Sequence, residues 1–154
     1  LAAMKKAHPY EEVAYDLYPL ANSYENTGSG MLATLRKSME NQAFLNQLKA
    51  IFKIPVVRHT RILKKKVQKI AICGGAGSFL TGAAIAAGAD VYLTADLKYH
   101  EFFDADERLV LADIGHYESE QYTIDLLFEV LKQNFPTFAV QKTVVNTNPV
   151  KYLL

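Results

Sequence analysis

The residues whose types and spacing most clearly indicate chemistry are His116 and Glu120. They follow an apolar run, Leu109–Ala112, that predicts a buried strand, and a helix is predicted to begin directly after it. Residues four positions apart lie on one face of a helix, so the imidazole and the carboxylate would point the same way. Both groups bind divalent zinc, manganese or iron. The pair therefore predicts half of a metal site, with a histidine–glutamate hydrogen bond at the helix start as the alternative.

Asp96 and His100 have the same spacing one predicted strand earlier, after Val91–Thr94. Taken alone, Asp96 fits a helix N-cap, whose side chain accepts a hydrogen bond from a backbone N–H. Parallel strands, however, present their carboxyl ends at one edge of the sheet, where α/β proteins bind ligands. Both acid–histidine pairs are therefore expected to open on the same edge. This convergence makes Asp96 and His100 candidate catalytic residues.

Other positions are candidates for supporting roles at this edge. Asp113 is the expected hydrogen-bond partner of a metal-binding imidazole. Lys98 would bind an anionic substrate, with a solvated lysine as the alternative. Gly75 and Ser78 belong to a glycine-rich turn, Gly74–Gly77, and to the helix predicted after it, where backbone N–H groups can bind phosphate or carboxylate. The spacing matches neither the dinucleotide fingerprint nor the Walker loop, so a tight turn is the alternative.

Three more sequence features bear on function. The segment His8–Glu12 places a histidine near two acids, but Pro9 argues against a regular helix, so the spacing fixes no side-chain direction. Cys73 has no base near it in sequence and is predicted to be a small buried side chain. Asn146–Pro149 is a turn by composition, and its position after the last predicted strand would place it beside the site.

Composition excludes several classes of protein. Of the 154 residues, 50% are hydrophobic and 21% charged, which fits a folded core and not a disordered chain or a coiled coil. A formal net charge of +1 gives no general attraction to nucleic acid. The single cysteine precludes an internal disulfide and fits a reducing cytosol. The longest apolar stretch, Ala83–Leu93, is too short to cross a bilayer. We therefore predict a soluble, cytoplasmic protein with no membrane partner.

The order of short strands and helices predicts an α/β fold, with a mostly parallel sheet and flanking helices, for the second part of the chain. The first part reads as a partial α+β segment, and the basic run Arg61–Lys66 between them is a solvated connector or, alternatively, a nucleic-acid contact. The predicted strands are Val13–Leu20, Met31–Leu35, Val56–His59, Lys69–Cys73, Val91–Thr94, Leu109–Ala112 and Thr137–Val145. The predicted helices are Ser38–Phe52, with Ser38 as N-cap, Ser78–Ala87, Lys98–Phe103 and Tyr117–Asn134. Apolar faces are formed by Phe44, Leu45, Leu48 and Phe52 in the first helix and by Ile124, Leu127, Phe128 and Leu131 in the last.

Five segments resemble, in this order, the Nif-three-like family, whose members carry the name GTP cyclohydrolase 1 type 2 homolog. They are AHPYEEVAYDLYPL, KIAICGGAGS, TADLKYHEF, ADIGHYESEQ and VVNTNPVKYL. The match runs along essentially the whole chain but covers only the C-terminal part of the family. Leu1–Lys6 reads as the last turns of a helix already begun. We therefore expect a C-terminal piece of a longer protein.

The resemblance implies two parts. Residues 1–60 look like the end of an inserted CutA/PII-like domain, and residues 66–154 look like the C-terminal α/β half of the family fold. Family members pair two such halves around a dinuclear metal centre and many assemble as a toroidal hexamer. The GHxxxE stretch, here His116 and Glu120, supplies two ligands. The other ligands, two histidines and an aspartate, belong to the first half. An intact subunit would bind two divalent ions, and in this chain they would be absent or only partly bound.

The resemblance further implies a metal-dependent hydrolase with a nucleotide-like substrate, in which water attacks C8 of the GTP purine ring. This chain alone is expected to be inactive. The competing hypothesis is a non-catalytic metal-binding scaffold or regulatory protein that forms a ring of identical subunits. The CutA-like segment favours it, as do clustered tyrosines that are typical of interfaces, namely Tyr10, Tyr15, Tyr18 and Tyr24.

Overall fold

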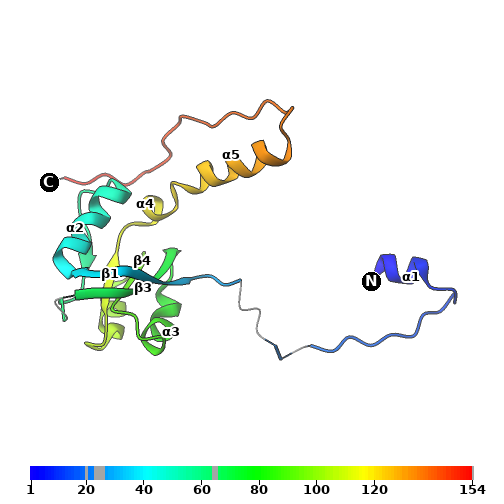
Figure 1. The fold of residues 1–154 in the computed structure, drawn as a ribbon, viewed down its shortest axis with the longest axis horizontal. Coiled ribbons are helices and arrows are strands. Elements are labelled where there is room, and N and C mark those ends of the chain that lie inside the picture. Colours follow the sequence, from blue (N-terminus) through cyan, green and yellow to red (C-terminus); the bar gives the residue numbers. More distant parts are fainter. Residues whose placement is uncertain (20, 23–26, 64–65, 154) are drawn as a thin grey trace.

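A five-stranded mixed sheet forms the centre of the molecule, with the strand order β1–β3–β4–β5–β2 (Figure 1). The computed structural model describes residues 1–19, 21–22, 27–63 and 66–153. The strands are β1 (Met31–Glu40), β2 (Arg58–His59), β3 (Lys66–Ala76), β4 (Val91–Ala95) and β5 (Val110–Asp113). The α-helices are α1 (Ala2–Ala7), α2 (Asn41–Phe52), α3 (Thr81–Ala86), α4 (His116–Glu120) and α5 (Thr123–Asn134), and two 3₁₀ helices are η1 (Ser78–Leu80) and η2 (Tyr99–Ala105).

The three central strands, β3, β4 and β5, are parallel, and each edge strand is antiparallel to its neighbour. Every residue of β4 is buried, which fits a continuous apolar run between two parallel neighbours. Thr94 of β4 is in register with Asp113 of β5. The carboxyl ends of these two strands therefore lie side by side, and the residues that follow them share one edge of the sheet.

Apolar side chains fill both faces of the sheet. One core packs α2 against the sheet, where Phe44, Leu45 and Leu48 are buried with Val91 and Val110. The other core lies on the α3 and η2 side and consists of Ala71, Cys73, Ala84, Ala89, Tyr92, Leu97, Ala105, Leu109 and Leu111. The predicted α/β architecture with flanking helices is thereby confirmed, as are the buried face of α2, with Phe52 partly buried, and the burial of Cys73.

The predicted strand at Val13–Leu20 is wrong for the described residues 13–19, which form no regular element, and Leu20 lies outside the described residues. The alternation of apolar and polar residues is present in the sequence, but a strand also needs a neighbour to hydrogen bond. Figure 1 shows this segment and α1 extending away from the sheet. The segment 13–19 therefore has no partner strand among the described residues.

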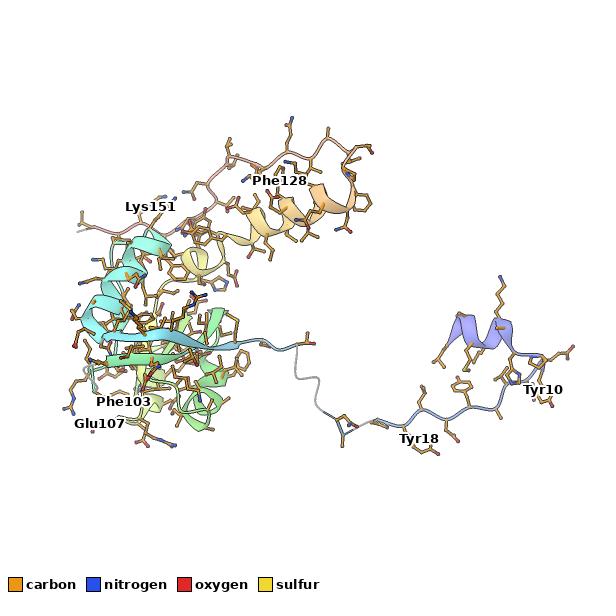
Figure 2. All side chains as sticks on the ribbon, in the orientation of Figure 1. Tyr10, Tyr18, Phe103, Glu107, Phe128 and Lys151 are labelled. Atoms are coloured by element: carbon orange, nitrogen blue, oxygen red, sulfur yellow. The ribbon has the colours of Figure 1, made fainter. Side chains whose placement is uncertain are left out.

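The predicted strand at Thr137–Val145 is also wrong, since Thr137 and Phe138 lie in a turn after α5 and residues 139–145 have no strand pairing. The single helix predicted at Tyr117–Asn134 divides into α4 and α5 around Gln121 and Tyr122. No residue of α5 is buried, so its predicted apolar face does not pack on the sheet. Figures 1 and 2 show α5, which carries Phe128, projecting beyond the sheet.

Four predicted boundaries also differ from the structure. Ser38 lies inside β1, which continues to Glu40, and Glu40 takes the N-cap position of α2. The glycine turn predicted at Gly74–Gly77 is mostly strand, because β3 continues to Ala76. The helices predicted to begin at Ser78 and Lys98 instead begin with the 3₁₀ turns η1 and η2.

Strands from both predicted parts of the chain join the one sheet. β1 pairs with β3, and β2 pairs with β5, with Arg58 opposite Asp113. The division into residues 1–60 and 66–154 remains a prediction. Among the described residues, no helix combines the length and the apolar character needed to span a membrane.

Candidate functional site

A cavity of about 870 Å³ opens at the carboxyl ends of β4 and β5. Such a volume is typical of small-molecule sites. Four carboxylates, one guanidinium and one imidazole contribute to its lining, namely Asp96, Asp113, Glu118, Glu120, Arg58 and His116. The extended segment at 143–150 and Tyr152 form another wall. Asn146–Pro149 therefore lies beside the cavity as predicted, but within this extended segment, since the strand predicted before it does not form.

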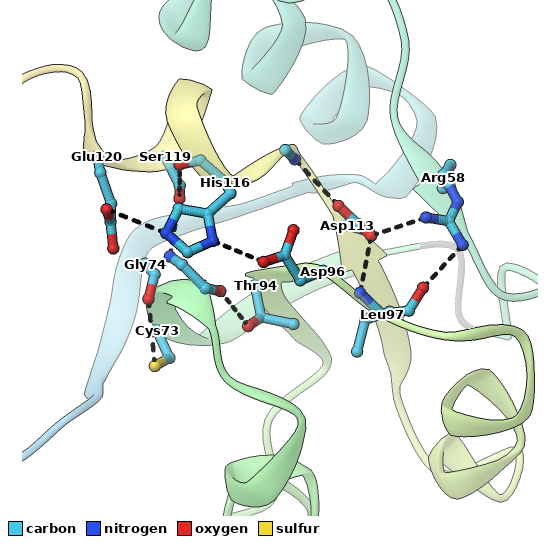
Figure 3. A network of polar contacts seen from close by, with 12 residues as sticks. Arg58, Cys73, Gly74, Thr94, Asp96, Leu97, Asp113, His116, Ser119 and Glu120 are labelled. Carbon is cyan, nitrogen blue, oxygen red and sulfur yellow. Dashed lines mark hydrogen bonds and ion pairs between the residues drawn. The ribbon is translucent and has the colours of Figure 1, made fainter. Parts of the chain in front are cut away.

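His116, the first residue of α4, has an acidic side chain beside each of its ring nitrogens (Figure 3). Its Nδ1 lies 2.7 Å from Oδ2 of Asp96, and its Nε2 lies 3.3 Å from Oε2 of Glu120. The shorter contact favours a proton on Nδ1, donated to Asp96, which leaves the Nε2 lone pair facing Glu120. The Asp96 hydrogen bond raises the pKa of His116 above its usual range.

Glu120, one helical turn after His116, lies against the backbone of Gly75. A Cβ built on Gly75 would collide with the Glu120 carboxylate and come within 3.3 Å of the His116 ring. Gly75 also has a φ of +65°, which favours glycine. Its N–H donates to Oγ of Ser119 at 2.9 Å, so Gly75 supports the site through close packing and not as a free anion-binding amide.

Asp96 follows β4 directly and has a φ of +56°, in the left-handed region that aspartate tolerates better than most residues. This conformation turns the chain sharply at the strand end. Lys98, and not Asp96, occupies the N-cap of η2. The alternative reading of Asp96 as a helix cap is therefore wrong, and its carboxylate is directed at His116 instead (Figure 3).

Asp113 does not hydrogen bond the His116 ring as predicted. Its buried carboxylate accepts from the backbone N–H groups of Leu97 and Gly115 and pairs with Arg58 at 3.1 Å. The parallel strands instead bring Asp96, twenty residues earlier, to the ring.

Glu118, Asn148 and Tyr152 form a group that sequence reasoning missed in part. Glu118 is only 8% exposed, and its Oε1 accepts from the Asn148 side-chain amide at 3.1 Å. Burial raises the pKa of Tyr152, and the nearby Glu118 charge raises it further. Turn composition marked Asn148, but the i, i+2 spacing of His116 and Glu118 gave no sign that both line one cavity.

Besides Gly75, three predicted residues lie outside this cavity lining. The His100 ring packs edge-on against Tyr99, 5.2 Å between centroids, and the exposed Lys98 belongs to the turn before η2. Ser78 begins η1. The histidine of the segment His8–Glu12 is exposed, and its Nδ1 accepts from the Tyr10 N–H. The catalytic role of His100 and the substrate-binding roles of Lys98 and Ser78 stay predictions.

The donors present fit part of a metal site. A divalent ion bound to nitrogen and oxygen at about 2.0–2.2 Å holds two adjacent ligands roughly 3 Å apart, and Nε2 of His116 lies 3.3 Å from the Glu120 carboxylate. Asp96 on the opposite ring nitrogen is the arrangement that orients metal-binding histidines. In the part of the chain that the structure describes, no cluster of three or more His, Cys, Asp or Glu side chains is placed to hold a metal.

A family model described as Duf34/NIF3 (NGG1p interacting factor 3) matches residues 3–149. The chain belongs to this family. The resemblance deduced from its five sequence segments is thereby confirmed.

Curated relatives carry the name GTP cyclohydrolase 1 type 2 homolog. The protein from Halalkalibacterium halodurans is 38% identical over 157 residues, which cover 99% of this chain and 42% of that protein. The one from Listeria innocua is 43% identical over 115 residues, which cover 74% of this chain and 31% of that protein. The chain thus spans less than half the length of these relatives.

Solved structures share the fold. A Bacillus cereus protein related to NIF3 has a TM-score of 0.72 and 34% identity, over 99% of this chain and 43% of that one. A Staphylococcus aureus protein has a TM-score of 0.74 and 29% identity, over 99% of this chain and 50% of that one. The mixed sheet with flanking helices is therefore the fold found in NIF3-related structures.

Gly75→Ala is expected to lower the free energy of unfolding by about 1–3 kcal/mol, because alanine combines a positive φ with a collision against Glu120. Urea denaturation measures the change. Gly82→Ala is the matched control, since a Cβ there meets no atom within 4 Å inside α3, and it should be neutral or stabilise by up to about 1 kcal/mol. Equal effects from both variants would contradict the packing role of Gly75.

Asp96→Asn is expected to lower the pKa of His116, because the Asp96 hydrogen bond is the largest cause of its elevation. A pKa raised in the folded state stabilises the protein below the unfolded value of about 6.5, and this contribution disappears as pH rises through the folded pKa. Proton NMR titration of the imidazole measures the pKa. Glu120→Gln should lower it less, and a larger effect from Glu120→Gln would contradict this ranking.

Proposed function

We propose that this chain supplies His116 and Glu120 to the dinuclear metal centre of a hydrolase that acts on a nucleotide-like substrate, of the GTP cyclohydrolase type. The observation that carries the proposal is the geometry of His116. Its Nε2 and the Glu120 carboxylate lie 3.3 Å apart, while Asp96 holds Nδ1 at 2.7 Å. The names of the curated relatives support the reaction class.

The remaining ligands, two histidines and an aspartate, would come from the part of the relatives that this chain does not cover. In the same proposal, residues 1–60 belong to a CutA/PII-like segment and residues 66–154 to the second half of the family fold. The intact subunit would bind two divalent ions, assemble as a toroidal hexamer and reside in the cytoplasm. None of these features is needed for the local geometry of His116.

The charges of the cavity also favour metal ions. Four carboxylates face one guanidinium, and that guanidinium already pairs with Asp113. Such a cavity attracts cations and repels the phosphates of a free nucleotide. A bound divalent ion supplies positive charge and activates water for attack near neutral pH. Asp96 would orient His116 throughout, and the wall at 143–150 would restrict the access of bulk water.

The second candidate is a non-catalytic, metal-binding scaffold that forms a ring. The observation in its favour is the exposure of tyrosines in the N-terminal segment, where Tyr10 is 71% and Tyr18 78% exposed. Figure 2 shows both standing far from the sheet. Tyrosines are enriched at protein interfaces, so this segment is suited to an assembly role.

The metal proposal predicts weak zinc binding by the 154-residue chain that depends on His116. Isothermal titration with Zn²⁺ should show at least about a tenfold loss of affinity in His116→Ala. His100→Ala is the matched control, because His100 does not line the cavity. Unchanged zinc affinity in His116→Ala would contradict the ligand role. Tight, stoichiometric zinc in the chain would contradict the need for ligands from elsewhere.

The hydrolase proposal predicts that the chain alone releases no formate from GTP. In a chimera, this chain is fused to the part of the Halalkalibacterium halodurans protein that it does not cover. The chimera should release formate, and its His116→Ala variant should release it at least about tenfold more slowly. Formate is measured enzymatically, and assembly by analytical ultracentrifugation. A chimera that binds metal and assembles without turnover would favour the scaffold over the hydrolase.

A further inference from the structure

We propose that Asp113 is a positioning residue that holds the turns after β4 and β5 at the spacing at which Asp96 hydrogen bonds His116. The inference rests on the proposed function only in taking His116 as a metal ligand. Asp113 lies in the lining of the same cavity, but its hydrogen bonds connect it to the turns that carry Asp96 and His116 only through backbone N–H groups.

Each oxygen of Asp113 holds a different turn. Oδ2 accepts from the Leu97 N–H at 3.1 Å, in the turn that carries Asp96. Oδ1 accepts from the Gly115 N–H at 3.0 Å, in the turn that carries His116. The carboxylate is only 6% exposed, so water offers these N–H groups little competition. One rigid side chain therefore spans the two turns (Figure 3).

Arg58 completes the clamp on Leu97. Its Nη1 pairs with Oδ2 of Asp113 at 3.1 Å, and its Nη2 donates to the Leu97 carbonyl at 2.9 Å. The N–H and the C=O of Leu97 are thus both held by this ion pair. Arg58 reaches Asp113 because β2 is antiparallel to β5 with these two residues opposite each other. Its guanidinium also lies over the Phe102 ring, 5.0 Å from the centroid.

Both turns contain a left-handed residue. Asp96 has a φ of +56° and Gly115 a φ of +86°. A Cβ on Gly115 would collide with the Glu118 carboxylate, so the second turn needs glycine. Asp96 has a side chain and occupies a sparsely populated region, which surrounding contacts must maintain. The hydrogen bonds to the adjacent Leu97 peptide are contacts of that kind.

The consequence of the clamp is control of the His116 tautomer. Asp96 selects the form with a proton on Nδ1 only while its carboxylate stays within hydrogen-bond distance of the ring. Movement of either turn lengthens that contact and lets the proton move to Nε2. The Nε2 lone pair, which faces Glu120, would then be lost. Asp113 therefore influences which ring nitrogen of His116 carries the proton, although it does not contact the ring.

The test is Asp113→Asn in the metal-free 154-residue chain, at a pH where the imidazole is neutral. The asparagine amide can accept on one side only, so one turn is released. Long-range ¹H–¹⁵N NMR of the His116 ring reports the two tautomers. We expect the ratio of the Nδ1–H form to the Nε2–H form to fall by about threefold to tenfold.

Thr60→Val is the matched control, because Thr60 Oγ1 accepts from the N–H of Leu111, within the same strand β5, and makes no hydrogen bond to either turn. It should lower stability and leave the tautomer ratio unchanged. If Asp113→Asn does not fold, Arg58→Lys tests the same clamp, since lysine cannot hold Asp113 and the Leu97 carbonyl as a fork. It should shift the ratio in the same direction.

A folded Asp113→Asn, or Arg58→Lys in its place, with the wild-type tautomer ratio would overturn the proposal. An equal shift in Thr60→Val would also overturn it, because general loosening of the edge would then explain the effect. Zinc affinity is measured separately on the same proteins. A zinc affinity that is unchanged in His116→Ala would contradict the proposed metal function. The tautomer ratio would still test the role of Asp113.

Discussion

The hydrogen bonds of the buried Asp113 carboxylate are the interaction on which the arrangement of the candidate site depends. The turns after β4 and β5 contain backbone N–H groups that the sheet does not pair, and Asp113 accepts one from each, at Leu97 and Gly115. Burying a carboxylate is unfavourable unless hydrogen bonds and an opposite charge compensate it. Arg58 supplies that charge from β2. The contacts that satisfy the buried group are therefore the ones that fix the site.

This dependence explains why a strand of only two residues matters. β2 adds little to the sheet, but its antiparallel register places Arg58 opposite Asp113. The longer strand β3 contributes differently, since Gly75 near its end leaves space for the Glu120 carboxylate. The edge strand β2, the central strands and Gly75 thus all contribute to the position of the His116 imidazole. Rigid elements of this kind position reactive groups more accurately than loops alone.

Two surfaces of the described structure are consistent with the proposal that this chain acts together with further protein. The cavity is lined by four carboxylates, one guanidinium and one imidazole, with the His116 ring beside Glu120. The helix α5 buries no residue, although its sequence has an apolar face. Isolated soluble proteins rarely expose extended apolar surface without a function for it. Together with the length of the relatives, these features support the proposal that the metal centre is completed from outside this chain.

The sequence by itself determined the elements whose patterns are local. The apolar runs of β4 and β5 and the face of α2 follow from burial, and the i, i+4 spacing joined His116 to Glu120, because a helix fixes that geometry without help from the rest of the chain. Alternation did not determine strands at the described residues 13–19 or at 137–145, since a strand needs a partner that no local pattern supplies.

The tertiary structure alone decided which carboxylate holds the imidazole. Asp113 was the predicted partner, but the left-handed turn at Asp96 and the parallel register of β4 and β5 brought Asp96 to His116. It also removed His100 from the cavity and brought Glu118 and Asn148 into its lining. Turn conformation and strand register are properties of hydrogen bonds between distant segments, and the order of residues in the chain does not record them.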